Sequence, residues 1–121
     1  MANLKRNMIK LVKNPEEAMK GNEIEYDTFW TSPFIPASVT YEAMDLADDM
    51  EKNEDKISAR ETVDLLGTFV ADKIYGGQFT LEDIKNKFHG PDLVGKLQEQ
   101  IVFIAQGQQN DETKNFLAKK R

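Results

Sequence analysis

Four apolar stripes at helical spacing, each closed by residues that end helices, constrain this 121-residue chain more than any other feature. Pro33 and Pro36 precede the first stripe, Gly76-Gly77 follows the second, His89-Gly90-Pro91 separates the third from the fourth, and Gly107 closes the last. Side chains that recur every three or four residues share one helix face and are buried against neighbouring elements. The pattern predicts a mainly α fold of the α+β class, with about four helices packed as a small bundle. The stripes are Val39, Ala43, Leu46, Ala47 and Met50; Val63, Leu66, Val70 and Ile74; Leu81, Ile84 and Phe88; and Leu93, Val94, Leu97, Ile101, Ile104 and Ala105.

Helix-start signals indicate where these helices begin. Prolines bias the preceding residues away from helix, so the first helix is expected to begin between Ala37 and Thr40. Ser58-Ala59-Arg60-Glu61 is a capping box, in which the serine oxygen accepts from the third amide while the glutamate reaches back. Thr80-Leu81-Glu82-Asp83 caps the third helix, and Pro91 suits the first turn of the fourth. The helical body is therefore expected to span residues 37–107.

The first third of the chain has the chemistry of strands. Met8–Lys13 and Ile24–Trp30 are rich in β-prone residues, and the second run alternates apolar with polar side chains. The polar segment between them ends in Gly21-Asn22, which is a turn signal. These features predict an N-terminal β-hairpin over residues 7–30. Because an isolated hairpin is marginally stable in water, it is expected to pack on the helical body or on another chain.

Basic residues are concentrated at both ends of the chain. Residues 1–13 hold four basic side chains and no acidic one, and residues 114–121 hold four more, which leaves eight basic residues against all 21 acidic ones in between. Residues 1–107 are expected to form one domain, and the polar residues 108–121 a flexible basic C-terminal tail. Solvation is the simplest role for such ends; contact with an acidic partner and contact with nucleic acid are the alternatives. Since the acidic middle would repel phosphates, no nucleic-acid partner is predicted.

Residues that carry chemistry are scarce. The chain has no cysteine, one histidine (His89), no phosphate-binding glycine motif and no nucleophile or metalloprotease motif. Adjacent carboxylates such as Asp48-Asp49 point to different helix faces and do not form an acid/base pair. No leader-like segment and no apolar run close to the ~20 residues of a membrane span is visible. The prediction is a soluble, non-enzymatic protein with no catalytic residues, metal or cofactor, and no membrane association.

Apolar side chains that lie off the helical stripes are the best candidates for a partner surface. A helix that is apolar on more than one face is either enclosed in its bundle or bound to something else. Enclosure of one central helix in the core explains some of them, and a binding surface explains the rest. Trp30 and Phe34 are added because aromatic side chains anchor interfaces. The predicted partner-binding residues are Trp30, Phe34, Tyr41, Met44, Leu65, Phe69, Val102 and Phe103.

The order of these segments resembles a known family. Ser32-Pro33-Phe34-Ile35-Pro36 precedes an alanine-containing helix, and a second helix leads to Gly77-Gln78-Phe79-Thr80-Leu81-Glu82-Asp83-Ile84. Gly90-Pro91-Asp92-Leu93 then opens an amphipathic helix that ends Ile104-Ala105-Gln106-Gly107. Over about residues 28–107 the chain resembles the tail assembly chaperones of long-tailed (siphovirus-type) bacteriophages, and the Gln78-Phe79-Thr80 stretch carries the most specific likeness.

The resemblance implies a non-catalytic assembly factor in the host cytoplasm. Such chaperones bind the long, helical tape-measure protein and help tail-tube subunits to polymerise around it. The implied partner is the tape-measure protein, and the tail-tube protein and a second copy of the chain are the further candidates. The family is commonly made in two lengths by ribosomal frameshifting, and this chain would be the short form. Lys119-Lys120 is either a slippage site, if a run of adenines encodes it, or part of an ordinary solvated terminus. The alternative is a small helical protein-binding regulator, or phage accessory protein, without an assembly role.

Overall fold

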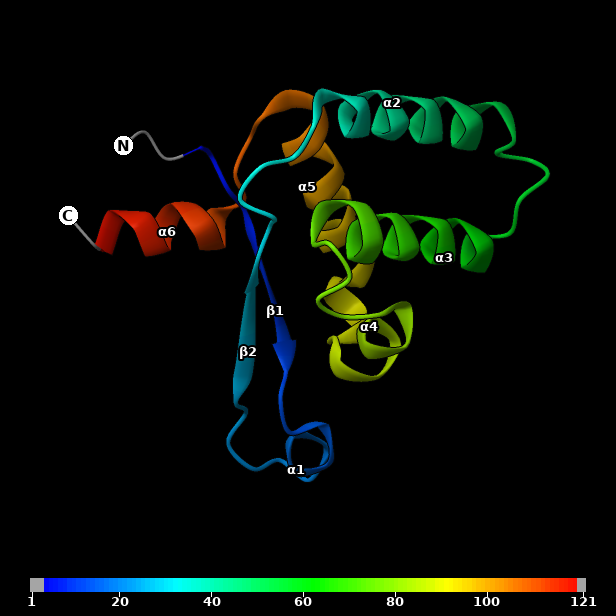
Figure 1. Cartoon of the computed structure of the whole chain (residues 1–121). Helices are drawn as coiled ribbons and strands as arrows, with labels where there is room; N and C mark the ends of the chain where they lie inside the picture. Colours follow the sequence, from blue (N-terminus) through cyan, green and yellow to red (C-terminus); the bar gives the residue numbers. More distant parts are fainter. Residues whose placement is uncertain (1–3, 120–121) are drawn as a thin grey trace.

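The computed structural model describes residues 4–119 and consists of a hairpin beside a body of helices (Figure 1). Helix α5 is the centre of the body, because α2, α3 and the π-helical segment η1 all pack against it. The hairpin lies along one side of helices α2 to α5, with β1 between β2 and α4, and α6 lies on the other side of the strands in this view. In chain order the elements are β1 (Met8–Val12), α1 (Pro15–Met19), β2 (Tyr26–Trp30), α2 (Ala37–Lys52), α3 (Ala59–Phe69), η1 (Val70–Ile74), α4 (Leu81–Lys87), η2 (Gly90–Asp92), α5 (Leu93–Gln106) and α6 (Asp111–Lys119).

The predicted helix ends are confirmed where a local signal sets them. Helix α2 begins at Ala37, directly after Pro36. The Ser58 hydroxyl accepts from the Glu61 amide at the start of α3, and at the start of α4 Thr80 and Asp83 form a complete, reciprocal capping box. Gly107 ends α5 in the left-handed conformation, with φ of 74°, which glycine adopts without steric cost.

The predicted number of about four helices is too low, because the described residues contain six α-helices. The four predicted helices are present as α2, α3, α4 and α5. The two missed helices, α1 and α6, are short and polar, so neither has the apolar stripe from which a helix is recognised in a sequence. Helix α6 is held by hydrogen bonds to distant residues, such as that between Thr113 and Met8.

The second predicted helix changes its winding before it ends. Regular helix stops at Phe69, and the Tyr75 amide donates to the Val70 carbonyl at 3.1 Å, five residues back, as in a π-turn. Val70, Ala71, Ile74 and Tyr75 are all buried, so this end of the helix belongs to the hydrophobic core.

The predicted hairpin is confirmed, with strands that pair antiparallel from Met8 opposite Trp30 to Val12 opposite Tyr26. Side chains alternate across the sheet, so Ile9, Leu11 and Phe29 share the face that packs on the helices. Ile9 and Leu11 are buried. The hairpin therefore belongs to the hydrophobic core and packs on this chain's own helical body.

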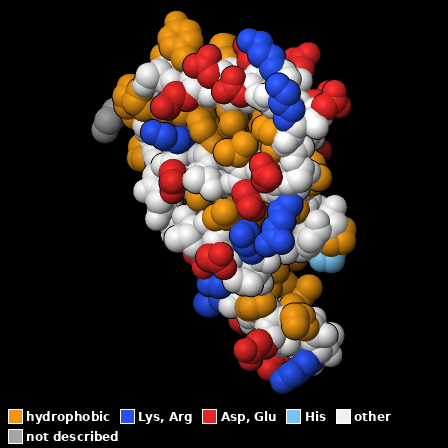
Figure 2. Space-filling model, turned by 90° about the vertical axis from the view of Figure 1, so that its right-hand side faces the viewer, with side chains coloured by type: hydrophobic (Ala, Val, Ile, Leu, Met, Phe, Trp, Pro, Cys, Tyr) orange, Lys and Arg blue, Asp and Glu red, His pale blue; other side chains and the backbone are white. Residues whose placement is uncertain are grey.

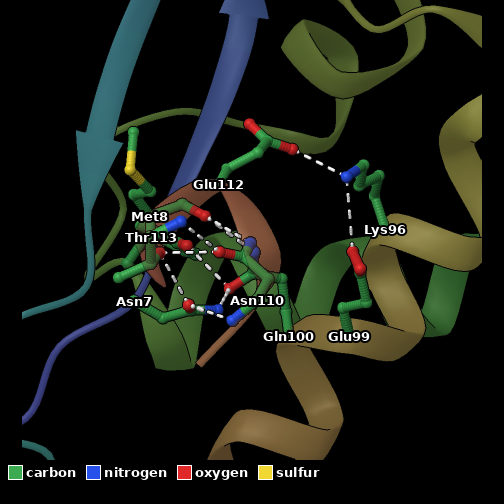
Figure 3. Close-up of polar contacts among 9 residues, drawn as sticks. Asn7, Met8, Lys96, Glu99, Gln100, Asn110, Glu112 and Thr113 are labelled. Atoms are coloured by element: carbon green, nitrogen blue, oxygen red, sulfur yellow. Dashed lines mark hydrogen bonds and ion pairs between the residues drawn. The ribbon is translucent and has the colours of Figure 1, made fainter. Parts of the chain in front are cut away.

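The prediction of a flexible tail from residue 108 is wrong for the part that the structure describes. Residues 111–119 form α6, which a network of buried amide and hydroxyl groups attaches to the start of β1 and to α5 (Figure 3). The Thr113 hydroxyl accepts from the Met8 amide at 3.0 Å, and the Asn110 amide donates to the Asn7 side chain at 2.9 Å. These contacts span more than a hundred residues of sequence, so no local pattern reveals them. Lys120 and Arg121 lie outside the described residues.

Candidate functional site

A mainly apolar groove lies on the surface where α2 and α3 border it and α5 forms its floor. It has a volume of about 320 Å³. Helices α2 and α3 each pack against α5, and the groove follows from the space between them. We call it the three-helix groove; it is lined by Ala43, Leu46, Ala47, Met50, Leu66, Gln98, Ile101 and Val102.

Small side chains on α2 keep the groove open. Ala43 and Ala47 lie one turn apart on the same helix face, where larger residues would fill the space above α5. Val94, two turns before Ile101 on the same face of α5, continues the apolar surface and is 47% exposed. None of the lining residues is ionisable, so the groove suits the binding of an apolar surface rather than proton transfer.

The outer side of α2 is strongly acidic. The helix contains five acidic residues and one lysine, and all five carboxylates are exposed. Within residues 4–119 only Glu42 among them forms an ion pair, at 3.6 Å from the Lys73 ammonium. Glu51 lies one helical turn after Ala47 on the same side of α2, and Asp48 directly follows Ala47 in the chain. Figure 2 looks onto the side of the molecule where α2 and α3 are joined and shows hydrophobic side chains gathered in its upper part, with acidic side chains around them.

The structure brings only some of the predicted partner-binding residues to this groove. Val102 lines it, and Met44 lies beside it, one turn before Ala47 on α2. Leu65 is exposed on α3, next to Leu66 in the chain. Tyr41 is 68% exposed on a different face of α2, because six residues separate it from Ala47.

The other predicted partner-binding residues lie elsewhere. Phe103 is only 6% exposed and is a core residue, and Phe69 is half-buried against the core, so both belong mainly to the folded interior. The Trp30 ring packs edge-on against Phe116 of α6, with centroids 5.4 Å apart. Phe34 is exposed beside a shallower hollow that includes Leu4, Lys5 and Thr40.

Sequence reasoning missed most of the groove because it assigned Leu46, Ala47, Met50 and Ile101 to buried stripes. A stripe shows which face of a helix is apolar, and it does not show whether the neighbouring helix closes over that face. The one available signal was the pair of alanines, Ala43 and Ala47, in a helix whose other stripe residues are larger.

Ionisable groups with shifted pKa values lie away from the groove. Burial raises the pKa of the Tyr75 hydroxyl far above its usual range. The backbone hydrogen bond from Thr80 lowers the pKa of the Asp83 carboxyl, in keeping with its capping role. No cluster of three or more His, Asp or Glu side chains suited to a metal ion occurs among residues 4–119. In the same part of the chain, no helix has the length and apolarity that crossing a membrane requires.

Comparison with known proteins identifies the family. The model of a family described as phage tail chaperone protein matches residues 3–121. The match therefore extends well beyond the segment that carries the resemblance in the sequence, and it includes the hairpin and α6. No curated protein and no solved structure matches the chain. Because the family model covers nearly the whole sequence, this chain belongs to the phage tail chaperone family.

Proposed function

We propose that this chain is a tail assembly chaperone that binds the tape-measure protein, keeps it soluble in the host cytoplasm and assists tail-tube assembly. The observation that supports the proposal most is the three-helix groove with its acidic border. A chaperone for a long helical protein needs a surface that accepts one apolar helix face at a time. A groove between two helices, floored by a third, is the usual shape of such a surface.

The chemistry of the groove suggests what the bound segment looks like. Apolar lining residues such as Met50 and Ile101 would contact side chains spaced three or four residues apart on the partner helix. The unpaired carboxylates of Asp48 and Glu51 would attract lysine or arginine beside that apolar stripe. Methionine fits this role because its flexible thioether adapts to differing partner side chains.

Co-expression with the cognate tape-measure protein tests the proposal. The chaperone is expected to raise the soluble fraction of the tape-measure protein and to co-elute with it in gel filtration. Ala47→Glu places a charge in the groove without lowering helix propensity much, and it should abolish this effect. Tyr41→Glu is the matched control, since it adds the same charge on another face of α2 and should leave binding intact.

Three outcomes would contradict the proposal. The tape-measure protein would be equally soluble alone, no complex would survive gel filtration, or both glutamate variants would bind as well as the wild type. Binding of the tape-measure protein without any gain in solubility or assembly would instead favour a protein-binding regulator.

A further inference from the structure

We propose that the outer edge of β2 is a second docking site, at which an extended segment of another protein adds as a third strand. The hairpin has two edges. Helix α4 lies against β1, and Thr113 of α6 accepts from the outward amide of Met8, whereas β2 faces away from α2 to α5 (Figure 1). This site is independent of the three-helix groove.

The strand register identifies which backbone groups face outward. The Lys13 amide donates to the Glu25 carbonyl and the Thr31 amide donates to the Asn7 carbonyl, so Asp27 and Phe29 also point their backbone groups toward β1. Tyr26, Thr28 and Trp30 therefore direct theirs away from β1. The amide of the Gln78 side chain donates to the Trp30 carbonyl at 2.8 Å, as this register requires.

Most of these outward groups lack a protein partner. Within the part of the chain that the structure describes, no hydrogen bond reaches the outward N–H and C=O groups of Tyr26 and Thr28, or the N–H of Trp30. On β1 the equivalent groups of Met8 are satisfied, because its amide donates to Thr113 and its carbonyl accepts from Gln100 and Asn110. The fold thus covers the first residue of β1 and leaves β2 open for strand addition.

Side chains beside the open edge define the chemistry of the added strand. Glu25 and Asp27 project on one face of β2 and form no ion pair within residues 4–119, so alternate residues of the partner would be lysine or arginine. On the opposite face Thr28 and Trp30 line a hollow together with Phe116 of α6 and with Lys10, Glu112 and Asn115. The intervening partner residues would meet the Trp30 ring and the Thr28 methyl group, which aliphatic side chains suit. The site suits an extended segment in which basic and aliphatic residues alternate.

A heptapeptide of alternating lysine and valine is the probe. Amide hydrogen exchange of the free chain should be faster at Tyr26 and Thr28 than at Asp27 and Phe29, whose amides point toward β1. The peptide should slow exchange at Tyr26, Thr28 and Trp30. A peptide with N-methylated valines lacks the donors that would face β2, and it should bind at least about fivefold more weakly, which is the loss of roughly one hydrogen bond. A glutamate–valine peptide should bind more weakly still.

A variant of the protein completes the test. Thr28→Pro removes an outward amide and no ladder hydrogen bond, so it should weaken peptide binding about fivefold or more, while Thr28→Ala should not. The N-methylated peptide needs no variant, so it remains decisive if Thr28→Pro fails to fold.

Equal binding of the N-methylated peptide, or protection away from β2, would overturn the inference. Protection at these amides that rises with protein concentration alone would show that a second copy of the chain occupies the edge, and would overturn the assigned partner. Ala47→Glu is expected to bind the peptide normally, so failure of this inference and failure of the groove proposal are distinguishable.

Discussion

The Tyr75 hydroxyl donates a 2.7 Å hydrogen bond to the side-chain oxygen of Gln100, which also accepts from the side-chain amide of Asn7 at 3.1 Å. All three side chains are fully buried. Gln100 sits in the middle of α5, where an apolar residue would otherwise fill the core. Its amide group therefore joins the end of the π-helical segment to the beginning of β1.

Gln100→Leu should destabilise the fold by about 2–5 kcal/mol. The substitution leaves the buried Tyr75 hydroxyl and the Asn7 side-chain amide without partners, and each such group costs about 1–3 kcal/mol. Urea denaturation followed by circular dichroism measures the loss. Gln106→Leu, on the exposed last turn of the same helix, is the control and should change stability by about 0.5 kcal/mol or less. Equal effects of the two variants would contradict the role of the buried network.

Thr113→Val should release α6 from the body. Valine keeps the shape of threonine but removes the hydroxyl that accepts from the Met8 amide and bonds the side chains of Asn7 and Asn110. Hydrogen exchange across residues 111–119 is expected to accelerate about tenfold or more, while exchange in α5 stays slow. Asn115→Ala, at an exposed position of α6, should leave the helix protected. Unchanged exchange in Thr113→Val would show that apolar contacts alone hold α6.

The docking of α6 should weaken at alkaline pH, because the ion pair between Lys96 and Glu112 is then lost. Their nitrogen and oxygen lie 2.7 Å apart, and the hydrogen bond to Glu112 raises the pKa of the Lys96 ammonium. The stabilisation is therefore present below the unfolded lysine pKa of about 10.4 and disappears as pH rises past the higher folded value. Since both groups are partly exposed, its size is expected to stay below about 1 kcal/mol.

Fluorescence of Trp30, the one tryptophan in the chain, measures this effect because its ring contacts Phe116 of α6. The urea midpoints of the wild type and Lys96→Met should differ at pH 9, and the difference should shrink at pH 11. A difference that stays constant across this range would contradict the assignment.

Alanine substitutions at Gly95 in α5 and at Gly107, which directly follows α5, should change stability in opposite directions. A Cβ at Gly95 meets nothing within 4 Å, and alanine there should stabilise the fold by about 0.5–1 kcal/mol through helix propensity. Gly107 has a φ of +74°, so alanine there should destabilise it by about 1–2 kcal/mol. Thermal unfolding of the two variants measures both changes. If both alanine substitutions stabilised the fold, the end of α5 would have relaxed to a right-handed conformation.

Alanine substitutions at Phe103 and Phe34 should differ in their effect on stability, because one ring lies in the core and the other on the surface. Phe103→Ala is expected to cost about 3–5 kcal/mol because the ring is buried in the core. Phe34→Ala should cost little, since that side chain is 67% exposed. Chemical denaturation of both variants tests the assignment, and a stable Phe103→Ala protein would return Phe103 to the candidates for partner binding.

What the sequence determined by itself was local. Periodic apolar residues predicted α2 to α5, and prolines, capping residues and Gly107 set several of their ends, because such signals act within one or two turns of helix. Strand alternation predicted the hairpin for the same reason. The resemblance carried by Gln78-Phe79-Thr80 and its flanking motifs agreed with the family later matched.

The tertiary structure alone decided which apolar faces are closed. Leu46, Ala47 and Ile101 read as core residues in the sequence, and they line an open groove because α2 and α3 rest on α5 with a space between them. Helix α6 could not be predicted from the sequence either, since Asn7 and Thr113, which hold it in place, are 106 positions apart. Contacts between such distant residues depend on how whole elements pack, and no local spacing in the chain encodes that.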